Sequence, residues 1–327
     1  MPTFLSGIQS SGRPHLGNYF GAILQHIKLQ DEPGDSLFFI ADYHALTNVK
    51  DPEQVRTNVR EVAVTYLSLG LDPEKAIFFR QSDVPEVTEI TWLLSCVTGM
   101  GLLERAHSYK DKTARGLKAS VGLFTYPILM AADILAYDST IVPVGKDQIQ
   151  HIEMAQDMAG SFNALYGDVF VRPEARIPSN ALLAKVPGLD GEKMSKSYGN
   201  DLWIFEQGKA LKKAVGRILT DSREPSEPKD PSGVLLLDFL ALFLDEADLA
   251  DWTERVRAGG EGAPGYGHLK LRLIEAIDAA FAPAREKREL FLADPAEVDR
   301  ILAAGSQRAR ERAVRTRDRA IAACGLR

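Results

Sequence analysis

The first residues able to carry chemistry form a glycine-containing turn between an apolar run and a helical pattern that is expected to run from Tyr19 to Gln30. Residues 9–18 read Gln-Ser-Ser-Gly-Arg-Pro-His-Leu-Gly-Asn and follow the β-rich run Thr3 to Ile8. Backbone N–H groups and the positive end of a helix dipole meet at such a junction, where glycine lets a phosphate approach closely. His15 and Asn18 add side chains that can donate to phosphate. The turn is a candidate anion site, and a turn that merely needs glycine is the alternative.

A second candidate is the pentapeptide Lys-Met-Ser-Lys-Ser at residues 193–197, which follows Gly-Leu-Asp-Gly-Glu at residues 188–192. Two lysines with interleaved hydroxyl groups on a glycine-hinged loop can close over a polyphosphate and stabilise charge as it develops. A charge run on a solvated loop is the alternative. Its pairing with the upstream turn favours phosphate chemistry. The sequence contains neither the three-glycine dinucleotide fingerprint nor the phosphate-binding loop that ends in Gly-Lys-Ser/Thr.

A carboxylate in an apolar helical run is the third candidate. Tyr126, Met130, Asp133 and Tyr137 are spaced by four, three and four residues, so they share one helix face. The neighbours of Asp133 are apolar, and an unpaired buried charge costs on the order of several kcal/mol, so this carboxylate needs a donor. The donor is either a ligand or an internal partner, such as a salt bridge or a neighbouring backbone N–H.

These candidates require a scaffold, and the first half of the chain alternates β-rich runs with helical patterns. The expected strands are Thr3 to Ile8, Ser36 to Ala41, Ala76 to Gln81 and Thr140 to Val144. A helix is expected from Asp51-Pro52 to about Leu69, closed by Gly70. This rhythm predicts a doubly wound, Rossmann-like α/β domain with a parallel sheet.

Past residue 200 the β-rich runs end and helical patterns take over. Helices are expected at Gly208 to Leu219, Leu235 to Leu244, Tyr266 to Phe281 and Pro295 to Ala323. We therefore expect a catalytic domain at residues 1–200 and a smaller, all-helical domain at residues 201–327 that includes the C-terminal helix.

Composition sets the broad class of the protein. The 327 residues are 45% hydrophobic and 26% charged, with a net charge of −6, which is typical of an ordinary two-domain globular protein. No apolar run reaches the roughly 20 residues of a membrane span, and the N-terminus has no secretory pattern. Cys96 and Cys324 lie far apart and give no zinc spacing. We expect a cytoplasmic protein with free thiols, no structural metal and no membrane partner.

The two motifs resemble the HIGH-type and KMSKS signatures of class I aminoacyl-tRNA synthetases, and the sequence around them resembles the tryptophanyl-tRNA synthetases of that class. The resemblance covers nearly the full chain and is least specific in the helical C-terminal third. It runs through Gly7-Ile8-Gln9 to Ala22, Asp42-Tyr43-His44-Ala45, Thr125-Tyr126-Pro127 to Tyr137, Val142 to His151, Thr220-Asp221-Ser222 and Gly265-Tyr266-Gly267.

The resemblance implies an ATP-dependent enzyme that joins L-tryptophan to tRNA(Trp) through tryptophanyl-adenylate and releases pyrophosphate and AMP. Mg²⁺ would accompany the triphosphate, with no metal held by protein side chains. A homodimer is implied, with the helical domain reading the anticodon. The family also implies that Asp133 accepts the indole N–H, which suits a pocket that rejects phenylalanine because that analogue leaves a buried acceptor unpaired.

The resemblance assigns site residues in three groups. The catalytic group comprises His15, Asn18, Lys112, Lys193 and Lys196. The ATP-binding group comprises Gln9, Ser10, Ser11, Gly17, Asn18, Gly145, Asp147 and residues 193–197, that is Lys193, Met194, Ser195, Lys196 and Ser197. The tryptophan-binding group comprises Leu5, Gly7, Gln9, His44, Tyr126, Met130, Asp133, Val142, Val144 and Gln148, with Tyr126 and Gln148 on the α-ammonium.

Three positions depart from the family pattern. Leu5 stands where many relatives have Phe, Ser11 replaces the usual Pro, and Lys146 stands where an acidic residue is common. None of the three removes a catalytic group. A tyrosyl-tRNA synthetase-like enzyme and a non-catalytic nucleotide-binding relative stay open as alternatives.

A basic stretch near the C-terminus is a candidate tRNA surface. Six arginines, at positions 308, 310, 312, 315, 317 and 319, are accompanied only by Glu311 and Asp318. The resemblance implies phosphate contacts here, since phosphate binding dominates the affinity of proteins for nucleic acid. A solvated helix face is the alternative.

Overall fold

The computed structural model describes residues 1–106, 109–110, 120–145, 148–177 and 186–326. The chain forms two compact units. The sheet unit comprises the described residues of Met1–Gly12, His26–Pro178 and Phe291–Arg327, and the helical unit comprises those of Arg13–Gln25 and Ser179–Leu290. Within the part that the structure describes, no helix is both long and apolar enough to cross a bilayer.

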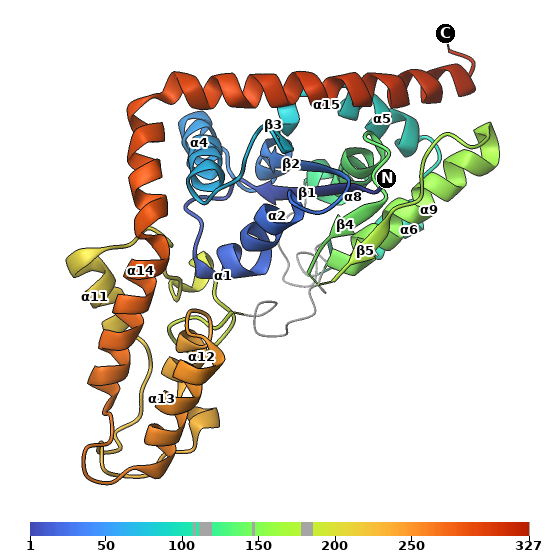
Figure 1. Ribbon diagram of the computed structural model, residues 1–327. Coiled ribbons are helices and arrows are strands. Elements are labelled where there is room, and N and C mark those ends of the chain that lie inside the picture. The colour runs from blue at the N-terminus through green and yellow to red at the C-terminus, as the bar shows by residue number, and fades with distance from the viewer. Residues whose placement is uncertain (107–108, 111–119, 146–147, 178–185, 327) are drawn as a thin grey trace. The chain divides into compact units, whose positions relative to one another are not determined.

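The sheet unit is built on a five-stranded parallel sheet of order β3-β2-β1-β4-β5 (Figure 1). The first four strands confirm the prediction; the five are β1 Thr3–Gln9, β2 Asp35–Ala41, β3 Ala76–Arg80, β4 Ile141–Pro143 and β5 Glu174–Arg176. The strand order reverses between β1 and β4, and in sheets of this kind ligands bind beyond the carboxyl ends of the strands at such a reversal. The predicted doubly wound α/β fold is confirmed.

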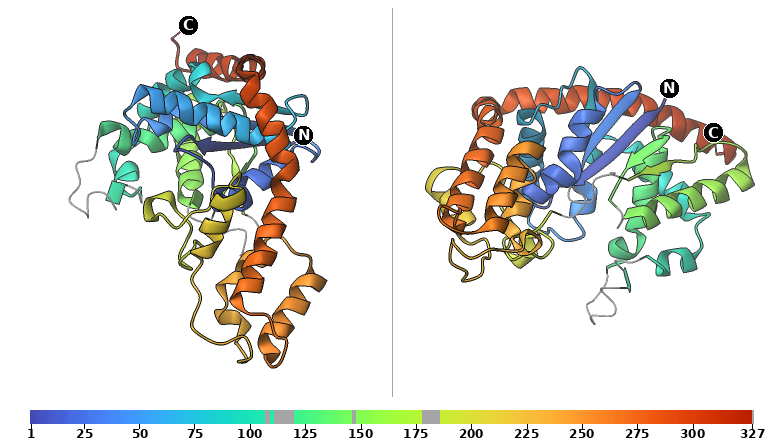
Figure 2. Two further views of the ribbon diagram at one scale, coloured as in Figure 1. Left: turned by 90° about the vertical axis from the view of Figure 1, so that its left-hand side faces the viewer. Right: turned by 60° about the horizontal axis from the view of Figure 1, so that its bottom comes forward.

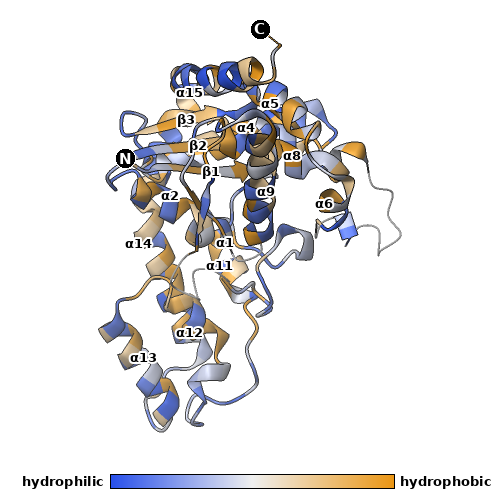
Figure 3. Cartoon of the chain, turned by 90° about the vertical axis from the view of Figure 1, so that its right-hand side faces the viewer, coloured by the Kyte–Doolittle hydropathy of each residue, from blue (hydrophilic) through white to orange (hydrophobic). Residues whose placement is uncertain are grey.

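Strand β5 was not predicted from the sequence, because it is only three residues long, Glu-Ala-Arg, with both charged ends exposed. It pairs with β4 alone at the edge of the sheet. Strands β2 and β3, by contrast, are largely hydrophobic (Figure 3) and almost entirely buried. A central strand of a covered parallel sheet gives a clear apolar run, whereas a short edge strand gives none.

Helices cover both faces of this sheet. Among the described residues, the helices that lie wholly in this unit are α3 Asp42–Ala45, α4 Pro52–Ser68, α5 Glu86–Ser95, α6 Met100–Glu104, α8 Val121–Leu135, α9 Ile149–Tyr166 and α15 Pro295–Ala323, with a 3₁₀ turn at Gln81–Asp83. Helix α4 begins and ends as predicted, since the Asp51 carboxylate accepts from the Glu53 N–H at 3.1 Å and Gly70 adopts a φ of 105°.

The helical unit contains α1 Leu16–Asn18, a π-helical turn at Tyr19–Ile23, α11 Gly208–Gly216, a 3₁₀ turn at Pro231–Gly233, α12 Leu235–Leu240, α13 Glu246–Ala258 and most of α14 Tyr266–Ala293. Helix α13 was not predicted, because it is acidic and mostly exposed. The single helix expected from Tyr19 to Gln30 is divided by the π-helical turn, and α2 Leu24–Leu29 follows it. The boundary between the two units falls inside α2.

The two units differ from the expected domains at residues 1–200 and 201–327. Residues 13–25 and 186–200 belong to the helical unit, whereas α15 belongs to the sheet unit. Helix α15 packs along β3, α4 and α5 (Figures 1 and 2). At Gly305 a side-chain carbon would lie 1.9 Å from the Phe78 carbonyl oxygen, so the helix approaches the strand as only glycine permits. The helical pattern in the sequence does not reveal that α15 packs against β3 and its neighbouring helices.

The arginines of α15 bind to the sheet unit. Arg310 forms a double hydrogen bond with the buried Glu86, and Arg312, Arg317 and Arg319 pair with Asp35, Glu89 and Asp138 respectively. The Arg308 guanidinium donates to the Pro73 carbonyl oxygen at 2.9 Å. Five of the six arginines are therefore engaged with groups of the sheet unit, and the contact of this stretch with tRNA phosphates stays a prediction.

Candidate functional site

The glycine-containing turn leads into the N-terminus of α1, where His15 is the capping residue. The Asn18 N–H donates to His15 Nδ1 at 3.3 Å, and the His15 N–H donates to Asn18 Oδ1 at 3.1 Å. Burial and the nearby positive charge of Lys196 lower the pKa of His15 to about 4. The imidazole is therefore neutral at pH 7, and because Nδ1 accepts, the proton lies on Nε2. His15 Nε2 and the Asn18 amide nitrogen are both donors for an anion.

The two predicted signatures meet inside the helical unit. The Gly17 N–H donates to the Met194 sulfur at 3.4 Å across 177 residues of sequence. A side-chain carbon at Gly17 would lie 3.0 Å from the His15 ring and 3.5 Å from Met194 Cβ, so glycine is required for this close approach. Met194 is buried, whereas Lys193 is exposed and Lys196 half-buried. The structure thus brings together the two motifs that the sequence separates.

The buried Asn200 shapes the lysine loop, and the sequence analysis did not single it out. Its carbonyl oxygen accepts from the Ser195 N–H at 2.8 Å, and its amide nitrogen donates to Asp190 at 2.8 Å and to the Lys193 carbonyl oxygen at 3.3 Å. A side-chain carbon at Gly188 would lie 2.3 Å from this amide nitrogen. Lys196–Tyr198 then form a 3₁₀ turn, and the Ser195 and Ser197 hydroxyl groups lie 2.8 Å apart.

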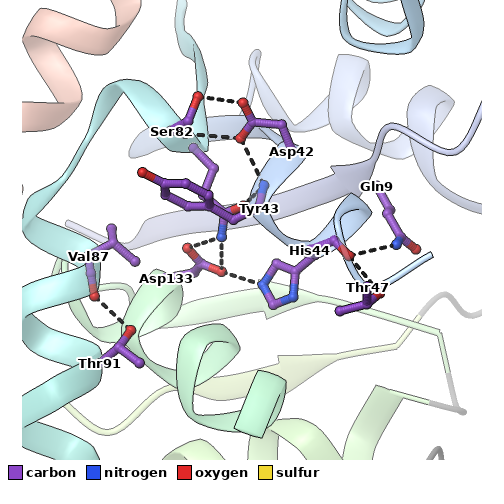
Figure 4. A network of polar contacts seen from close by, with 10 residues as sticks. Gln9, Asp42, Tyr43, His44, Thr47, Ser82, Val87, Thr91 and Asp133 are labelled. Carbon is purple, nitrogen blue, oxygen red and sulfur yellow. Dashed lines mark hydrogen bonds and ion pairs between the residues drawn. The ribbon is translucent and has the colours of Figure 1, made fainter. Parts of the chain in front are cut away.

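Asp133 lies on α8 in the sheet unit and is 2% exposed, which confirms its predicted internal position. Its carboxylate Oδ2 lies 2.8 Å from His44 Nε2 (Figure 4). The Gln81 side-chain nitrogen donates to both carboxylate oxygens, at 2.7 and 2.8 Å. Burial raises the pKa of Asp133, and the hydrogen bonds from His44 and Gln81 oppose that rise.

Gln81 is a second residue that the sequence analysis missed as part of the site. It is 1% exposed and follows β3 directly. Its side-chain oxygen accepts from the Tyr43 N–H at 3.0 Å, which turns its nitrogen toward Asp133. The available signal was a polar residue at the carboxyl end of a predicted central strand. Asp42 fixes the same corner, because its carboxylate accepts from the Tyr43 N–H and from the Ser82 N–H and hydroxyl (Figure 4).

His44 connects this carboxylate network to the end of β1. Its carbonyl oxygen accepts from the Gln9 side-chain nitrogen at 3.2 Å and from the Thr47 hydroxyl at 2.8 Å (Figure 4). Its ring lies edge-on to that of Tyr126, and the Tyr126 hydroxyl lies 2.6 Å from His151 Nε2. Gln9, His44, Asp133 and Tyr126 therefore belong to one connected corner of the sheet unit.

The other predicted pocket residues surround this corner or lie in the core. Leu5 and Val142 are buried in the core of the sheet unit, and Met130 and Val144 pack against that core. A side-chain carbon at Gly7 would lie 2.4 Å from the Phe39 ring, so glycine is needed there. Gln148 precedes α9, and its N–H donates to the Gly145 carbonyl oxygen at 2.9 Å.

The remaining phosphate-site predictions fall at the end of β1 or outside the described residues. The Ser10 side chain is fully buried, and the exposed Ser11 donates its N–H to the Gln9 carbonyl oxygen at 2.9 Å. Lys112, Asp147 and Lys146 lie outside the described residues. Among the described residues no three His, Cys, Asp or Glu side chains gather as metal ligands would.

Comparison with known proteins links these features to a family. The model of the family described as "tRNA synthetases class I (W and Y)" matches residues 1–282. The chain is 54% identical over 323 residues to the tryptophan–tRNA ligase of Rhodopirellula baltica, with 99% of each chain covered. It is 50% identical over 307 residues to that of Campylobacter jejuni, with 94% of each covered.

A solved structure gives the same picture. The crystal structure of the Campylobacter jejuni tryptophanyl-tRNA synthetase in complex with ADP and tryptophan is similar to this chain with a TM-score of 0.91 and 47% identity. The match covers 99% of this chain and 100% of that one. A structure of the corresponding protein from Mycoplasma pneumoniae matches with a TM-score of 0.82 at 30% identity, covering 100% of this chain and 98% of that one.

Proposed function

The chain belongs to the class I tRNA synthetases for tryptophan and tyrosine and ligates tryptophan to tRNA, and from this premise we propose how its residues act. ATP and tryptophan first form tryptophanyl-adenylate with release of pyrophosphate, and transfer to tRNA then releases AMP. The observation that carries the assignment of the phosphate site is the contact between Gly17 and Met194, which joins both signatures.

In the first step the tryptophan carboxylate attacks the α-phosphate in line, so the protein's task is to position the reactants and stabilise charge. We assign phosphate binding to Gln9, Ser10 and Ser11 at the end of β1 and to Gly17, Asn18 and His15 at the start of α1. The neutral His15 supports this assignment, because its Nε2 proton is available as a donor at pH 7.

The lysine loop acts on the leaving group. Lys193 and Lys196 close on the pyrophosphate as its charge develops, while Met194, Ser195 and Ser197 shape the loop around it. The hydrogen bonds that Asn200 makes to Ser195 and Lys193 support a preformed loop. By the resemblance, Lys112 reaches the triphosphate, Gly145 and Asp147 bind the nucleotide, and Mg²⁺ enters with the triphosphate.

Tryptophan binds by its indole N–H to Asp133. An ionised carboxylate has about four acceptor positions, and Gln81 and His44 occupy three of them, so one is left for the indole. Leu5, Gly7, His44, Met130, Val142 and Val144 would line the pocket, and Gln9, Tyr126 and Gln148 would bind the amino acid's polar end. A phenylalanine complex leaves that acceptor position unpaired, which is the physical basis of the preference for tryptophan over phenylalanine.

The expected partners are tRNA(Trp) and a second copy of the chain. Support for a homodimer comes from large apolar side chains on the surface of the sheet unit, among them Trp92, 70% exposed, and Val121, 79% exposed. Their neighbours Thr91 and Gly122 lie at a pocket of about 440 Å³ that His44 and Tyr126 of the proposed tryptophan site also line, so this apolar surface adjoins that site. Exposed apolar patches of this kind mark protein interfaces. Free thiols at Cys96 and Cys324 agree with a cytoplasmic location.

Amino-acid-dependent exchange of pyrophosphate into ATP tests this function. We expect exchange with tryptophan and none above background with tyrosine or phenylalanine at equal concentrations. Exchange with tyrosine and not with tryptophan would show that tyrosine is the substrate. Absence of exchange with all three would favour the non-catalytic nucleotide-binding relative.

A further inference from the structure

Helix α11 in the helical unit carries a basic face that the proposed mechanism does not use. Lys209, Lys212 and Lys213 are exposed, and their spacing places them on one side of the helix. Leu211 and Val215 are fully buried on the other side. Residues 208–220 contain no aspartate or glutamate. The helix is therefore amphipathic, with a hydrophobic side toward the protein and a purely cationic side toward solvent.

The three lysines differ from the arginines of α15 in their pairing. Over the described residues, no ion pair or side-chain hydrogen bond involves Lys209, Lys212 or Lys213. The arginines at 310, 312, 317 and 319 each bind an acid of the sheet unit. Charge that an internal acid already compensates adds little to anion binding, whereas uncompensated exposed charge retains its full attraction.

The C-terminal end of α11 is fixed beside the lysine signature. The Arg217 guanidinium donates to the Gly199 carbonyl oxygen at 2.8 Å, directly after the 3₁₀ turn Lys196–Tyr198. The Lys270 ammonium donates to the Gly216 carbonyl oxygen at 2.8 Å. These two cations therefore have structural roles, which leaves the three lysines as the side chains available to a ligand. The helix fixes the spacing of their Cα atoms.

We propose that the Lys209, Lys212 and Lys213 face of α11 binds the phosphate backbone of tRNA. The proposal rests on the proposed function only in taking tRNA as the partner. Lys209 and Lys213 lie about 6 Å apart along the helix axis, since each residue rises about 1.5 Å, so together they can contact neighbouring phosphates of one strand.

The chemistry of the face favours a phosphate backbone over a protein partner. No large apolar or aromatic side chain is exposed on α11, whereas a protein interface needs an apolar core. Lysine ammonium groups act as point charges without base-reading geometry, so the contact should be independent of sequence. It would add affinity for the tRNA without selecting it.

The test uses the full-length chain with Lys209→Gln, Lys212→Gln and Lys213→Gln combined. We expect the Kd for a tRNA(Trp) transcript to rise about tenfold or more at moderate salt, and the slope of log K against log salt to fall by about two units, because each lost phosphate contact removes roughly 0.7 to 0.9. Tryptophan-dependent pyrophosphate exchange should stay within about twofold of wild type. An unrelated tRNA should lose the same affinity.

A matched control neutralises three cations that already pair with acids on their own helices, Arg56→Gln, Arg255→Gln and Arg300→Gln. It changes the net charge equally and should keep the wild-type salt slope. A Lys-to-Arg triple variant at 209, 212 and 213 should restore binding. Equal losses in both glutamine variants would overturn the proposal, as would wild-type binding in the α11 variant. Loss of exchange in the wild-type chain would instead refute the proposed function.

Discussion

The replacement Gln81→Met tests whether the buried amide positions the tryptophan acceptor. Methionine is close to glutamine in shape but removes both hydrogen bonds to Asp133 and the acceptor for the Tyr43 N–H. The ionised form of Asp133 then loses one of its two stabilising partners, and only His44 remains in a site where burial already raises the pKa of Asp133. We expect the acid limb of the kcat/KM profile for tryptophan to move to higher pH, because more of Asp133 is protonated at a given pH.

The magnitude follows from the type of bond that is lost. A hydrogen bond to a charged group contributes about 1.5 to 3 kcal/mol. Only tryptophan offers an N–H to Asp133, and protonation of Asp133 replaces the charged acceptor of that N–H by a neutral one, so we expect a loss of this size in the ratio of kcat/KM for tryptophan to that for phenylalanine. At about 1.4 kcal/mol per factor of ten, the ratio should fall by about 10- to 150-fold. Pyrophosphate exchange with each amino acid measures it.

A matched variant separates positioning from stability. Ser82→Ala removes the hydroxyl that donates to Asp42, in the residue next to Gln81, without touching Asp133. It should lower stability by about 1 kcal/mol and leave the amino-acid ratio unchanged. If Gln81→Met lowers the free energy of unfolding but keeps both the ratio and the pH profile of wild type, Gln81 is a structural residue only and the reasoning fails.

Three further outcomes follow from the same contacts. Asp133→Asn should lower the preference for tryptophan over phenylalanine by about 2 to 4 kcal/mol, and an unchanged kcat/KM ratio would refute the pocket assignment. Lys196→Ala should slow adenylate formation on the order of 10²-fold in single-turnover kinetics with little change in tryptophan affinity, whereas an unchanged rate would make the loop a solvated charge run. The ring Nδ1 of His26 lies 2.8 Å from the Tyr66 hydroxyl, and burial lowers the pKa of this imidazole to about 3. Below about pH 6.5 the unfolded chain therefore takes up a proton that the folded chain does not. The free energy of unfolding should fall by about 1.4 kcal/mol for each pH unit of acidification. Urea unfolding of His26→Phe with Tyr66→Phe should show a pH slope smaller by about one proton, and an equal slope would contradict this assignment.

The elements that were predicted correctly each leave a clear local signal in the sequence. Strands β2 and β3 are almost entirely buried, so most positions in them are apolar, and α4 carries its own start and stop residues. Strand β5 and helix α13 lack such signals because they are short or largely exposed. Both signatures were visible because their residues are contiguous in the chain.

Gln81 and Asn200 show why the rest of the site could not be predicted. Each is a single polar residue whose role depends on which backbone groups the fold places around it. Gln81 meets Asp133 across 52 residues and Tyr43 across 38, and no spacing rule connects these positions. Sequence reasoning correctly required a donor for Asp133 because burial of an unpaired carboxylate is costly. It had no means of choosing the donor before the topology was known.

The same limit explains the two basic helices. In the sequence, the six arginines near the end of α15 form the denser cationic cluster, and the three lysines of α11 were not predicted to bind a ligand. Ion pairs in the folded chain reverse this ranking of the two helices. Arg312 pairs with Asp35, 277 residues away in the sequence, and Arg310 pairs with Glu86, 224 residues away. Local charge counting cannot include such distant acids. The charge that is available to an external polyanion is the part that the fold leaves uncompensated, and on these two helices it lies mainly on α11.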